Sequence, residues 1–356
     1  MKIGLAAVEI NNQIRKKINQ ALDEGMIGGG RFIKEFEEKF AKYIGVKYAV
    51  FVSNGTVADS LAVAAVMDGK RDEVIMPALT FVAQPNAVLH AGLKPIFVDV
   101  NQYGQIDPKE VEKKINKKTL AIFVTHLLGR VADLSELSLL AEKKKVYLLE
   151  DCCEALGAKF NWYKVGGFGS IGTFSFYASH HISTGEGGMC VTNDRQIYDK
   201  LVSLRNHGRK SDKIEDVFTF EQVGWNAKGT NLQAAIGSVM IDKLDKIIEK
   251  RRKNIEYLGG WWLEEQDGEY ASPHCFPIFT EKRDEMIKKL FEQGIEARPL
   301  MASIPTQCPA YIKRKIKGNF KWADWLGYFG LFVPCHQNLT KEQLKYLKDK
   351  INEFNR

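Results

Sequence analysis

Short runs of β-branched and aromatic residues recur along the first part of the chain, and several are apolar throughout rather than on one face. Amphipathic stretches separate most of these runs. One begins at Asp107-Pro108-x-Glu110, which supplies an N-cap, a proline in the first helical position and a returning acid. This alternation predicts a mainly parallel sheet covered by helices on both faces. The expected strands are 48–53, 73–79, 94–100, 120–128, 146–151, 172–178 and 189–194.

The pattern changes after Asn231. Residues 232–258 form one long helical stretch, and a mixed region with weaker strand signals follows. Thr340-x-x-Gln343 then predicts a capped, amphipathic helix that ends near Phe354. We therefore predict a large domain over residues 1–235, which includes an N-terminal helical segment, and a smaller C-terminal α+β domain over residues 236–356.

Composition and charge argue against several classes of protein. The 356 residues carry a formal net charge of +7 but no basic stripe interleaved with aromatic residues, so nucleic-acid binding is not expected. No apolar run is long enough to cross a membrane, and the first ten residues lack the apolar core of a signal peptide. Six scattered cysteines form no Cys-x-x-Cys or Cys-x-Cys pair, which argues against a metal site. We expect a cytoplasmic protein without a bound metal.

Residues 167–172, Gly-Phe-Gly-Ser-Ile-Gly, match the dinucleotide fingerprint G-x-G-x-x-G. That fingerprint binds pyrophosphate only when a strand precedes it and a helix follows. Here a polar loop precedes the match, and a strand-like run follows it. We therefore predict a turn at this position and not a nicotinamide-binding site.

Two other segments supply groups that pyridoxal chemistry requires. Asp151 ends an expected buried strand, where a carboxylate can keep a pyridine nitrogen protonated. Gly55 and Thr56 follow a strand and open an expected helix, where N–H groups and a hydroxyl can hold a phosphate. Taken singly, each segment also has an ordinary explanation, because strand-end acids cap turns and Ser-Asn-Gly-Thr is a common helix start.

A third segment, residues 173–188, closely resembles the motif of one known enzyme family. It reads Thr-Phe-Ser-Phe-Tyr-Ala-Ser-His-His-Ile-Ser-Thr-Gly-Glu-Gly-Gly and resembles S-F-Y-x-x-K-x-x-T-T-G-E-G-G of the DegT/DnrJ/EryC1/StrS sugar aminotransferases. In that family the serine binds the cofactor phosphate and the lysine forms a Schiff base with the cofactor. Ser175 matches the serine, whereas His180 stands in place of the lysine. His181, one position further, is interpreted as a structural residue.

The resemblance extends from about Gly29 to Tyr311. Residues 223–226 and 231–237 are similar to the family's G-Y-N and L-Q-A-A-I-G segments, and Phe81 falls where the family places an aromatic ring over the pyridine. It implies the α/β, aspartate aminotransferase-like fold of fold-type I pyridoxal phosphate enzymes, with a seven-stranded sheet. It also implies a homodimer with shared active sites, because Asn226 matches an asparagine that reaches the neighbouring subunit's phosphate.

The histidine changes the implied chemistry. Imidazole forms no stable Schiff base, so pyridoxamine or pyridoxal phosphate would be held by non-covalent contacts alone. His180 is then either a damaged or engineered residue in an inactive aminotransferase, or a base with a pKa near ~6.5. The context F-Y-x-x-H-H-I resembles the family's 3-dehydratases of deoxysugar biosynthesis. Glu154 also favours the 3-dehydratases. Ordinary sugar aminotransferases usually carry glutamine at this position of the cofactor site, three residues after the pyridine aspartate, whereas the 3-dehydratases carry an acid there.

The resemblance therefore implies removal of the 3-hydroxyl from a nucleotide-linked 4-keto-6-deoxyhexose, with L-glutamate as amino donor, in O-antigen or other deoxysugar biosynthesis. Some 3-dehydratases carry an iron–sulfur cluster on a Cys-x-Cys pair, but residues 210–213, where that pair would fall, contain no cysteine. A cluster-free enzyme is expected. Two alternatives stay open: a sugar aminotransferase whose lysine has been replaced, and a non-catalytic regulatory protein on the same fold. Arg298 could meet a substrate phosphate or carboxylate, or be an ordinary surface arginine.

Overall fold

The computed structural model describes residues 1–356 except 7, 212, 260–263 and 355–356. Residue 212 belongs to the segment 210–213, which was predicted to lack a cluster-binding cysteine pair, and it lies outside the described residues. A seven-stranded sheet forms the centre. Strand β10 runs antiparallel to both neighbours, and the other neighbouring pairs are parallel. All seven expected strands are confirmed, with ends shifted by a few residues. In sheet order they are β1 (Tyr48–Val52), β10 (Gly188–Thr192), β9 (Ile171–Ser175), β6 (Tyr147–Asp151), β5 (Thr119–Thr125), β2 (Glu73–Pro77) and β4 (Lys94–Val98).

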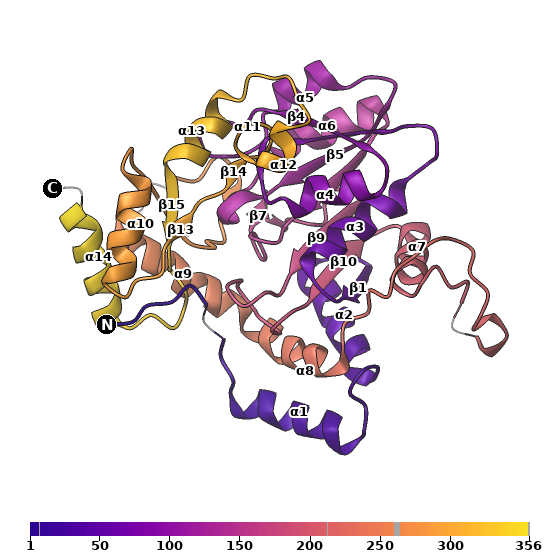
Figure 1. The fold of residues 1–356 in the computed structure, drawn as a ribbon. Helices are drawn as coiled ribbons and strands as arrows, with labels where there is room; N and C mark the ends of the chain where they lie inside the picture. Colours follow the sequence, from indigo (N-terminus) through magenta and orange to yellow (C-terminus); the bar gives the residue numbers. More distant parts are fainter. Residues whose placement is uncertain (7, 212, 260–263, 355–356) are drawn as a thin grey trace.

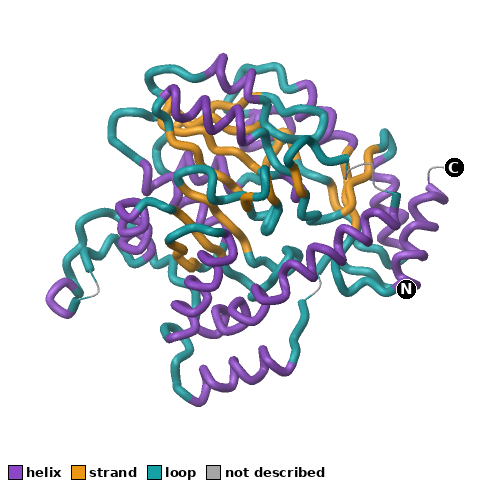
Figure 2. Tube along the Cα trace, turned by 180° about the vertical axis from the view of Figure 1, so that it is seen from behind, coloured by secondary structure: helices purple, strands orange, loops and turns teal. Residues whose placement is uncertain are grey.

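Helices cover the sheet on both faces (Figures 1 and 2). Alternate residues of the buried strand β5 feed two separate cores: Ile122 and Val124 belong to one, Ala121 and Phe123 to the other. Helices α1, α2, α6 and α8 contribute to the first core, and α3, α4 and α7 to the second. Their bounds are α1 (Asn12–Asp23), α2 (Arg31–Ile44), α3 (Gly55–Val66), α4 (Ala83–His90), α5 (Pro108–Lys114), α6 (Leu134–Lys144), α7 (Arg195–Arg205) and α8 (Asn231–Met240), with short 3₁₀ turns η1 (Leu127–Gly129), η2 (Ile214–Asp216) and η3 (Ile241–Lys243).

The C-terminal region builds a third core around β12 and β15. The predicted capping box of the last helix is confirmed, because the Thr340 and Gln343 side chains each accept the other residue's backbone N–H. The division at 235/236 stays a prediction; it falls inside α8, which packs on α1 and α2. The remaining elements are α9 (Leu244–Leu258), β12 (Phe276–Phe279), α10 (Arg283–Glu292), β13 (Arg298–Pro299), α11 (Ile304–Gln307), α12 (Pro309–Ile312), α13 (Lys321–Phe329), β15 (Gly330–Val333) and α14 (Lys341–Phe354).

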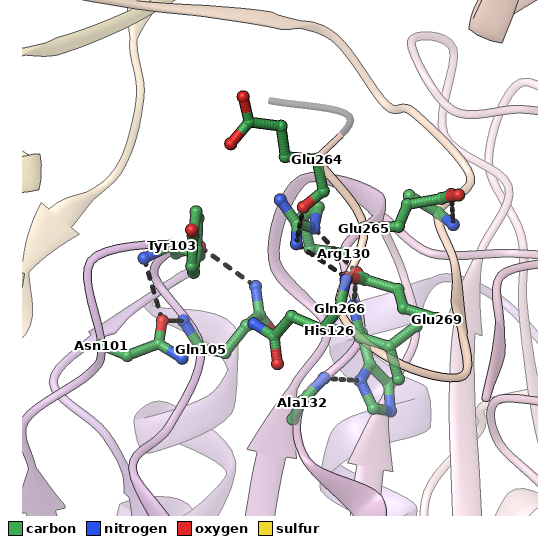
Figure 3. A network of polar contacts seen from close by, with 12 residues as sticks. Asn101, Tyr103, Gln105, His126, Arg130, Ala132, Glu264, Glu265, Gln266 and Glu269 are labelled. Carbon is green, nitrogen blue, oxygen red and sulfur yellow. Dashed lines mark hydrogen bonds and ion pairs between the residues drawn. The ribbon is translucent and has the colours of Figure 1, made fainter. Parts of the chain in front are cut away.

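Small strand pairings outside the central sheet tie the C-terminal region to the N-terminal part of the chain. Strand β14 (Ala302–Ser303) pairs with β3 (Leu79–Thr80), and β11 (Glu269–Tyr270) pairs with β7 (Lys159–Phe160), which pairs with β8 (Tyr163–Lys164). A buried ion pair reinforces the second connection: the Arg130 guanidinium, just after η1, makes two 2.7 Å bonds to the Glu269 carboxylate (Figure 3). In the described part of the chain, no helix is long and apolar enough to cross a bilayer.

The glycine-rich match at 167–172 is a loop that runs into β9, and no helix follows it. It binds an anion of the protein itself: the Glu150 carboxylate accepts the N–H groups of Gly166, Phe168 and Gly169 at 2.8, 2.9 and 2.6 Å. His126 Nε2 lies 3.2 Å from the same carboxylate. The prediction of a turn is therefore confirmed, and N–H groups of this loop already bind a carboxylate of the protein.

Candidate active site

Strands β1, β2, β5, β6 and β9 share one direction, so their carboxyl ends meet at one edge of the sheet, where open α/β sheets bind ligands. A cavity of about 1160 Å³ lies at this edge, and residues of the C-terminal region form its other wall. Asn226 is exposed and is not among the lining residues. The other predicted site residues all line the cavity: Gly55, Thr56, Phe81, Asp151, Glu154, Ser175 and His180.

The start of α3 and the end of β9 form an anion cradle. Asn54 caps the helix by accepting the Val57 N–H at 2.9 Å, while the preceding N–H groups of the first turn have no acceptor inside the helix. A Cβ on Gly55 would lie 2.7 Å from Ser175 Cβ and 3.1 Å from its Oγ. The cradle therefore requires glycine at 55. A helix N-terminus beside a serine hydroxyl suits a phosphate.

Two buried carboxylates lie beside this cradle. Asp151 ends β6 and accepts the Cys153 N–H at 3.0 Å, while Asp59, one turn into α3, accepts the Thr173 hydroxyl at 2.7 Å. Burial raises the pKa of Asp151, and burial together with Asp151 raises the pKa of Asp59 well above its usual range. A cationic group between them would relieve this cost. Sequence reasoning missed Asp59, although a lone acid within the mostly apolar segment Gly55–Val66 was a usable signal.

A second group of side chains, His180, His274 and Glu154, occupies the wall formed with the C-terminal region. The His180 and His274 rings are 5.0 Å apart between centroids, and His274 Nε2 lies 3.8 Å from Glu154 Oε1. Leu128 N–H donates to the other Glu154 oxygen at 2.8 Å. Burial raises the pKa of Glu154 to about 7. His274 gave no local sequence signal, because it reaches the site through tertiary folding.

The surroundings of His180 give its imidazole a lower pKa than the sequence suggested. Burial lowers the pKa of the His180 imidazole to about 3, and the positive charge of Arg251 adds to this shift. The value near ~6.5 expected from the sequence is therefore wrong for the environment that the protein alone provides. At neutral pH the imidazole is uncharged and keeps a lone pair that can accept a proton.

Neighbouring residues hold this wall in place. The buried guanidinium of Arg251 donates to the carbonyl oxygens of His180 at 3.1 Å and of His274 at 2.8 Å. His181 is buried outside the cavity lining, and its Nε2 lies 2.8 Å from Ser272 Oγ.

Two arginines line the cavity. Arg298, whose role sequence reasoning left open, is one of them, and it pairs with Glu296 at 2.6 Å. Arg283, which sequence reasoning did not consider, lines the cavity as well.

A mainly parallel seven-stranded sheet with such a cavity at its carboxyl edge is the architecture of aminotransferase-like pyridoxal phosphate enzymes. The profile of the DegT/DnrJ/EryC1/StrS aminotransferase family matches residues 8–352, and the chain belongs to this family. The family and fold expected from the sequence are confirmed.

Relatives with two different activities are similar to this chain over nearly its whole length. GDP-perosamine synthase of Escherichia coli O157:H7 is 36% identical over 351 residues, 96% of this chain and 95% of that protein. GDP-4-keto-6-deoxy-D-mannose 3-dehydratase of Yersinia pseudotuberculosis is 33% identical over 366 residues, 93% of each chain. A solved structure of the E. coli 3-dehydratase with bound hydrated pyridoxal phosphate is 31% identical, with a TM-score of 0.87 over 98% of this chain and 99% of that one. The chain is thus a sugar-modifying enzyme of the pyridoxal phosphate class.

Proposed function

We propose that the enzyme removes the 3-hydroxyl group from a nucleotide-linked 4-keto-6-deoxyhexose, with non-covalently held pyridoxamine phosphate as cofactor and L-glutamate as amino donor. The observation that carries the proposal is His180, which replaces the family's lysine and lies in the cavity wall with Glu154. A lysine could link the cofactor covalently and return a proton to carbon 4 of the sugar; the shorter imidazole favours elimination instead.

The cavity suits this cofactor. The cofactor's phosphate would be held by Gly55, Thr56 and Ser175, which form the cradle at the start of α3. The absence of a side chain at position 55 leaves room for the phosphate, because a Cβ there would lie against Ser175. Asp151, together with the buried Asp59 beside it, would hold a protonated ring nitrogen, and Phe81 would cover a face of the ring. When bound, the cofactor supplies an amine for the sugar's keto group and a ring that accepts electrons.

In this proposal His180 acts first as the base and then as the acid. With the cofactor bound, the neutral imidazole would accept a proton from the cofactor's amine-bearing carbon, and as an imidazolium it would donate that proton to the hydroxide that departs from carbon 3 of the sugar. The eliminated product would hydrolyse to a 3-deoxy-4-ketosugar with loss of ammonia, and glutamate would restore the cofactor's amine and leave as 2-oxoglutarate. No metal or iron–sulfur cluster takes part, in keeping with the scattered cysteines.

Relatives and surface residues support the choice of partners. Two similar relatives carry GDP in the names of their activities, so we propose a GDP-linked sugar of a lipopolysaccharide pathway. Arg283 and Arg298, at the cavity wall, would meet its phosphates. We further propose a homodimer in which Asn226 reaches the partner's cofactor phosphate; its exposure outside its own cavity, near the exposed Val223 and Trp225, supports this.

The second candidate is a sugar aminotransferase, which the 36% identity to GDP-perosamine synthase favours. Mass spectrometry separates the two after the protein is incubated with pyridoxamine phosphate, glutamate and GDP-4-keto-6-deoxymannose. We expect a sugar that has lost its 3-hydroxyl and has no nitrogen. An amino sugar that keeps this hydroxyl would instead support the aminotransferase, and no turnover across a panel of nucleotide 4-keto-6-deoxysugars would support the regulatory alternative.

Restoring lysine at position 180 is a direct test. We expect His180→Lys to shift the product from the deoxysugar toward the amino sugar, because a lysine amine can both hold the cofactor and reach carbon 4. The product ratio by mass spectrometry is the measurement, with the parent protein as control. An unchanged product would contradict the role given to His180.

Ser175→Ala tests the phosphate cradle. Losing a hydrogen bond to a charged group costs about 1.5–3 kcal/mol, so we expect cofactor affinity to fall about 10- to 100-fold. Ser60→Ala is the matched control, because Ser60 lies on α3, donates to the Thr56 carbonyl at 2.9 Å and does not line the cavity. Equal affinities of the two variants in equilibrium dialysis would remove Ser175 from the phosphate site.

A further inference from the structure

The C-terminal wall of the cavity carries an aromatic side chain to which the proposed function gives no role. Tyr328 lies on α13, lines the cavity and is 56% exposed. We propose that the Tyr328 ring is a stacking surface for the base of the nucleotide-linked sugar. This inference rests on the proposed function, because it assigns a binding site to the part of that substrate that lies farthest from the reacting carbons.

The cavity has room for a nucleotide beyond the cofactor. Its volume of about 1160 Å³ exceeds the ~300–1,000 Å³ of typical small-molecule sites. The cofactor would occupy the end at the sheet edge, where the phosphate cradle and Asp151 lie. A sugar that reacts there must extend its diphosphate and its base toward the opposite wall, which the lining residues between 283 and 332 form.

Tyr328 differs from the other aromatic residues of its helix. Trp325 contacts the rings of Trp322 and Phe329 edge to face. It is also stacked on Phe279, with 5.4 Å between the ring centroids. Of the aromatic residues on α13, Tyr328 is the one that lines the cavity, and no described ring stacks on it. A single exposed tyrosine needs no explanation by itself, but a ring without a partner in a ligand cavity offers its faces to a flat ligand.

An arginine that is proposed to meet the phosphates is fixed next to this ring. Arg283 Nη1 donates at 2.6 Å to the carbonyl oxygen of Gly327, the residue before Tyr328. Its Nε donates to Asp284 at 2.8 Å, while Nη2 has no acceptor among the described residues and can bind an anion in the cavity. The base of a nucleoside diphosphate lies one ribose away from its phosphates. A diphosphate bound to Arg283 therefore brings the base close to Tyr328.

Hydrogen bonds and close packing fix the position of α13. At its start, the Asp99 carboxylate accepts the N–H groups of the helix's second and third residues at 3.1 and 2.9 Å. Further along, Gln307 Nε2 donates to the Asp324 carbonyl oxygen at 2.9 Å. A Cβ on Gly327 would clash with the Gln307 side chain, so the close approach of the helix requires glycine there. A ring carried by a helix fixed in this way loses little freedom when a ligand binds.

The rest of this wall suits the faces of a base more than its edges. Its lining residues include the apolar Leu300, Met301 and Ile304. Apart from two arginines and Tyr328, the polar side chain among the described lining residues between 283 and 332 is that of Gln307. Its amide is already engaged, because Oε1 accepts a backbone N–H at 3.1 Å and Nε2 donates to a backbone carbonyl. Stacking is therefore the main contact that this wall offers to a base.

Calorimetric titration of the pyridoxamine phosphate-loaded enzyme with GDP and with inorganic pyrophosphate separates the base from the phosphates. We expect Tyr328→Ala to weaken GDP binding about 5- to 150-fold, the usual effect of losing a base–aromatic stack, and to leave pyrophosphate binding within about twofold. Tyr328→Phe keeps the ring and should bind GDP like the parent. Tyr163→Ala is the matched control, because Tyr163 is 73% exposed on β8, outside the cavity lining. It should also bind GDP like the parent.

Three results would overturn the stacking role. They are unchanged GDP affinity in Tyr328→Ala, equal losses of GDP and pyrophosphate affinity in that variant, and a Tyr328→Phe variant as weak as Tyr328→Ala. In turnover, Tyr328→Ala should raise the KM for the nucleotide sugar by the same factor as it weakens GDP binding, with kcat nearly unchanged. A parent that binds GDP through Tyr328 but converts no sugar would refute the proposed function and leave this inference standing. A parent that binds no GDP would overturn the inference itself.

Discussion

We expect His180→Asn to lower the rate of 3-deoxysugar formation by about 10²- to 10⁴-fold, the usual contribution of a positioned general base. Asparagine keeps the polarity and approximate size of the side chain but cannot accept a proton at neutral pH. Because the phosphate cradle and Asp151 lie on other elements, α3, β6 and β9, cofactor affinity should stay within about twofold of the parent value. Product formation by mass spectrometry and cofactor binding by absorbance measure the two effects separately.

His207→Asn is the matched control for this substitution. His207 is exposed, lies outside the cavity lining and has φ 63°, a conformation that asparagine tolerates well. The His207→Asn variant should form the 3-deoxysugar at the rate of the parent protein. A His180→Asn variant that keeps more than about one-tenth of the parent rate would show that another group removes the proton.

The parts of the site that could be predicted are those with local signals. Asp151 ends an apolar strand, and Gly55 separates a strand from a helix; the parallel order of the strands then brings them to one edge of the sheet. His274 carries no such signal. It reaches Glu154 because the segment after β11 donates backbone hydrogen bonds to carbonyl oxygens of η1 across a long separation in sequence.

The pKa of His180 could not be predicted for a related reason. The residue type suggests a group that titrates near neutral pH, but a pKa depends on solvent exclusion and on charges that tertiary folding brings close. Arg251, on α9, supplies the charge, and the same guanidinium binds the backbone carbonyl oxygens of both cavity histidines. One buried residue therefore shapes both the geometry and the electrostatics of this wall.

We expect Arg130→Met to lower the free energy of unfolding by about 3–5 kcal/mol, the usual cost of removing one partner of a buried ion pair. Arg130 and Glu269 are both almost fully buried, and Figure 3 shows their side chains pointing toward each other. Glu269 also accepts the Val131 N–H at 2.8 Å. The guanidinium further lies 4.9 Å from the ring of Tyr103. Chemical denaturation of parent and variant at equal protein concentration measures the difference.

The effect should reach the active site, because Arg130 directly follows η1, whose Leu128 N–H holds Glu154, and Glu269 begins the strand that leads to His274. Arg130→Met should therefore also lower the rate of 3-deoxysugar formation, measured by mass spectrometry of the product. Arg195→Met is the control: its ion pair with Asp199 is exposed, so both the stability and the rate should change little. If Arg130→Met were no more destabilising than Arg195→Met, the buried pair would not be what holds η1 against β11.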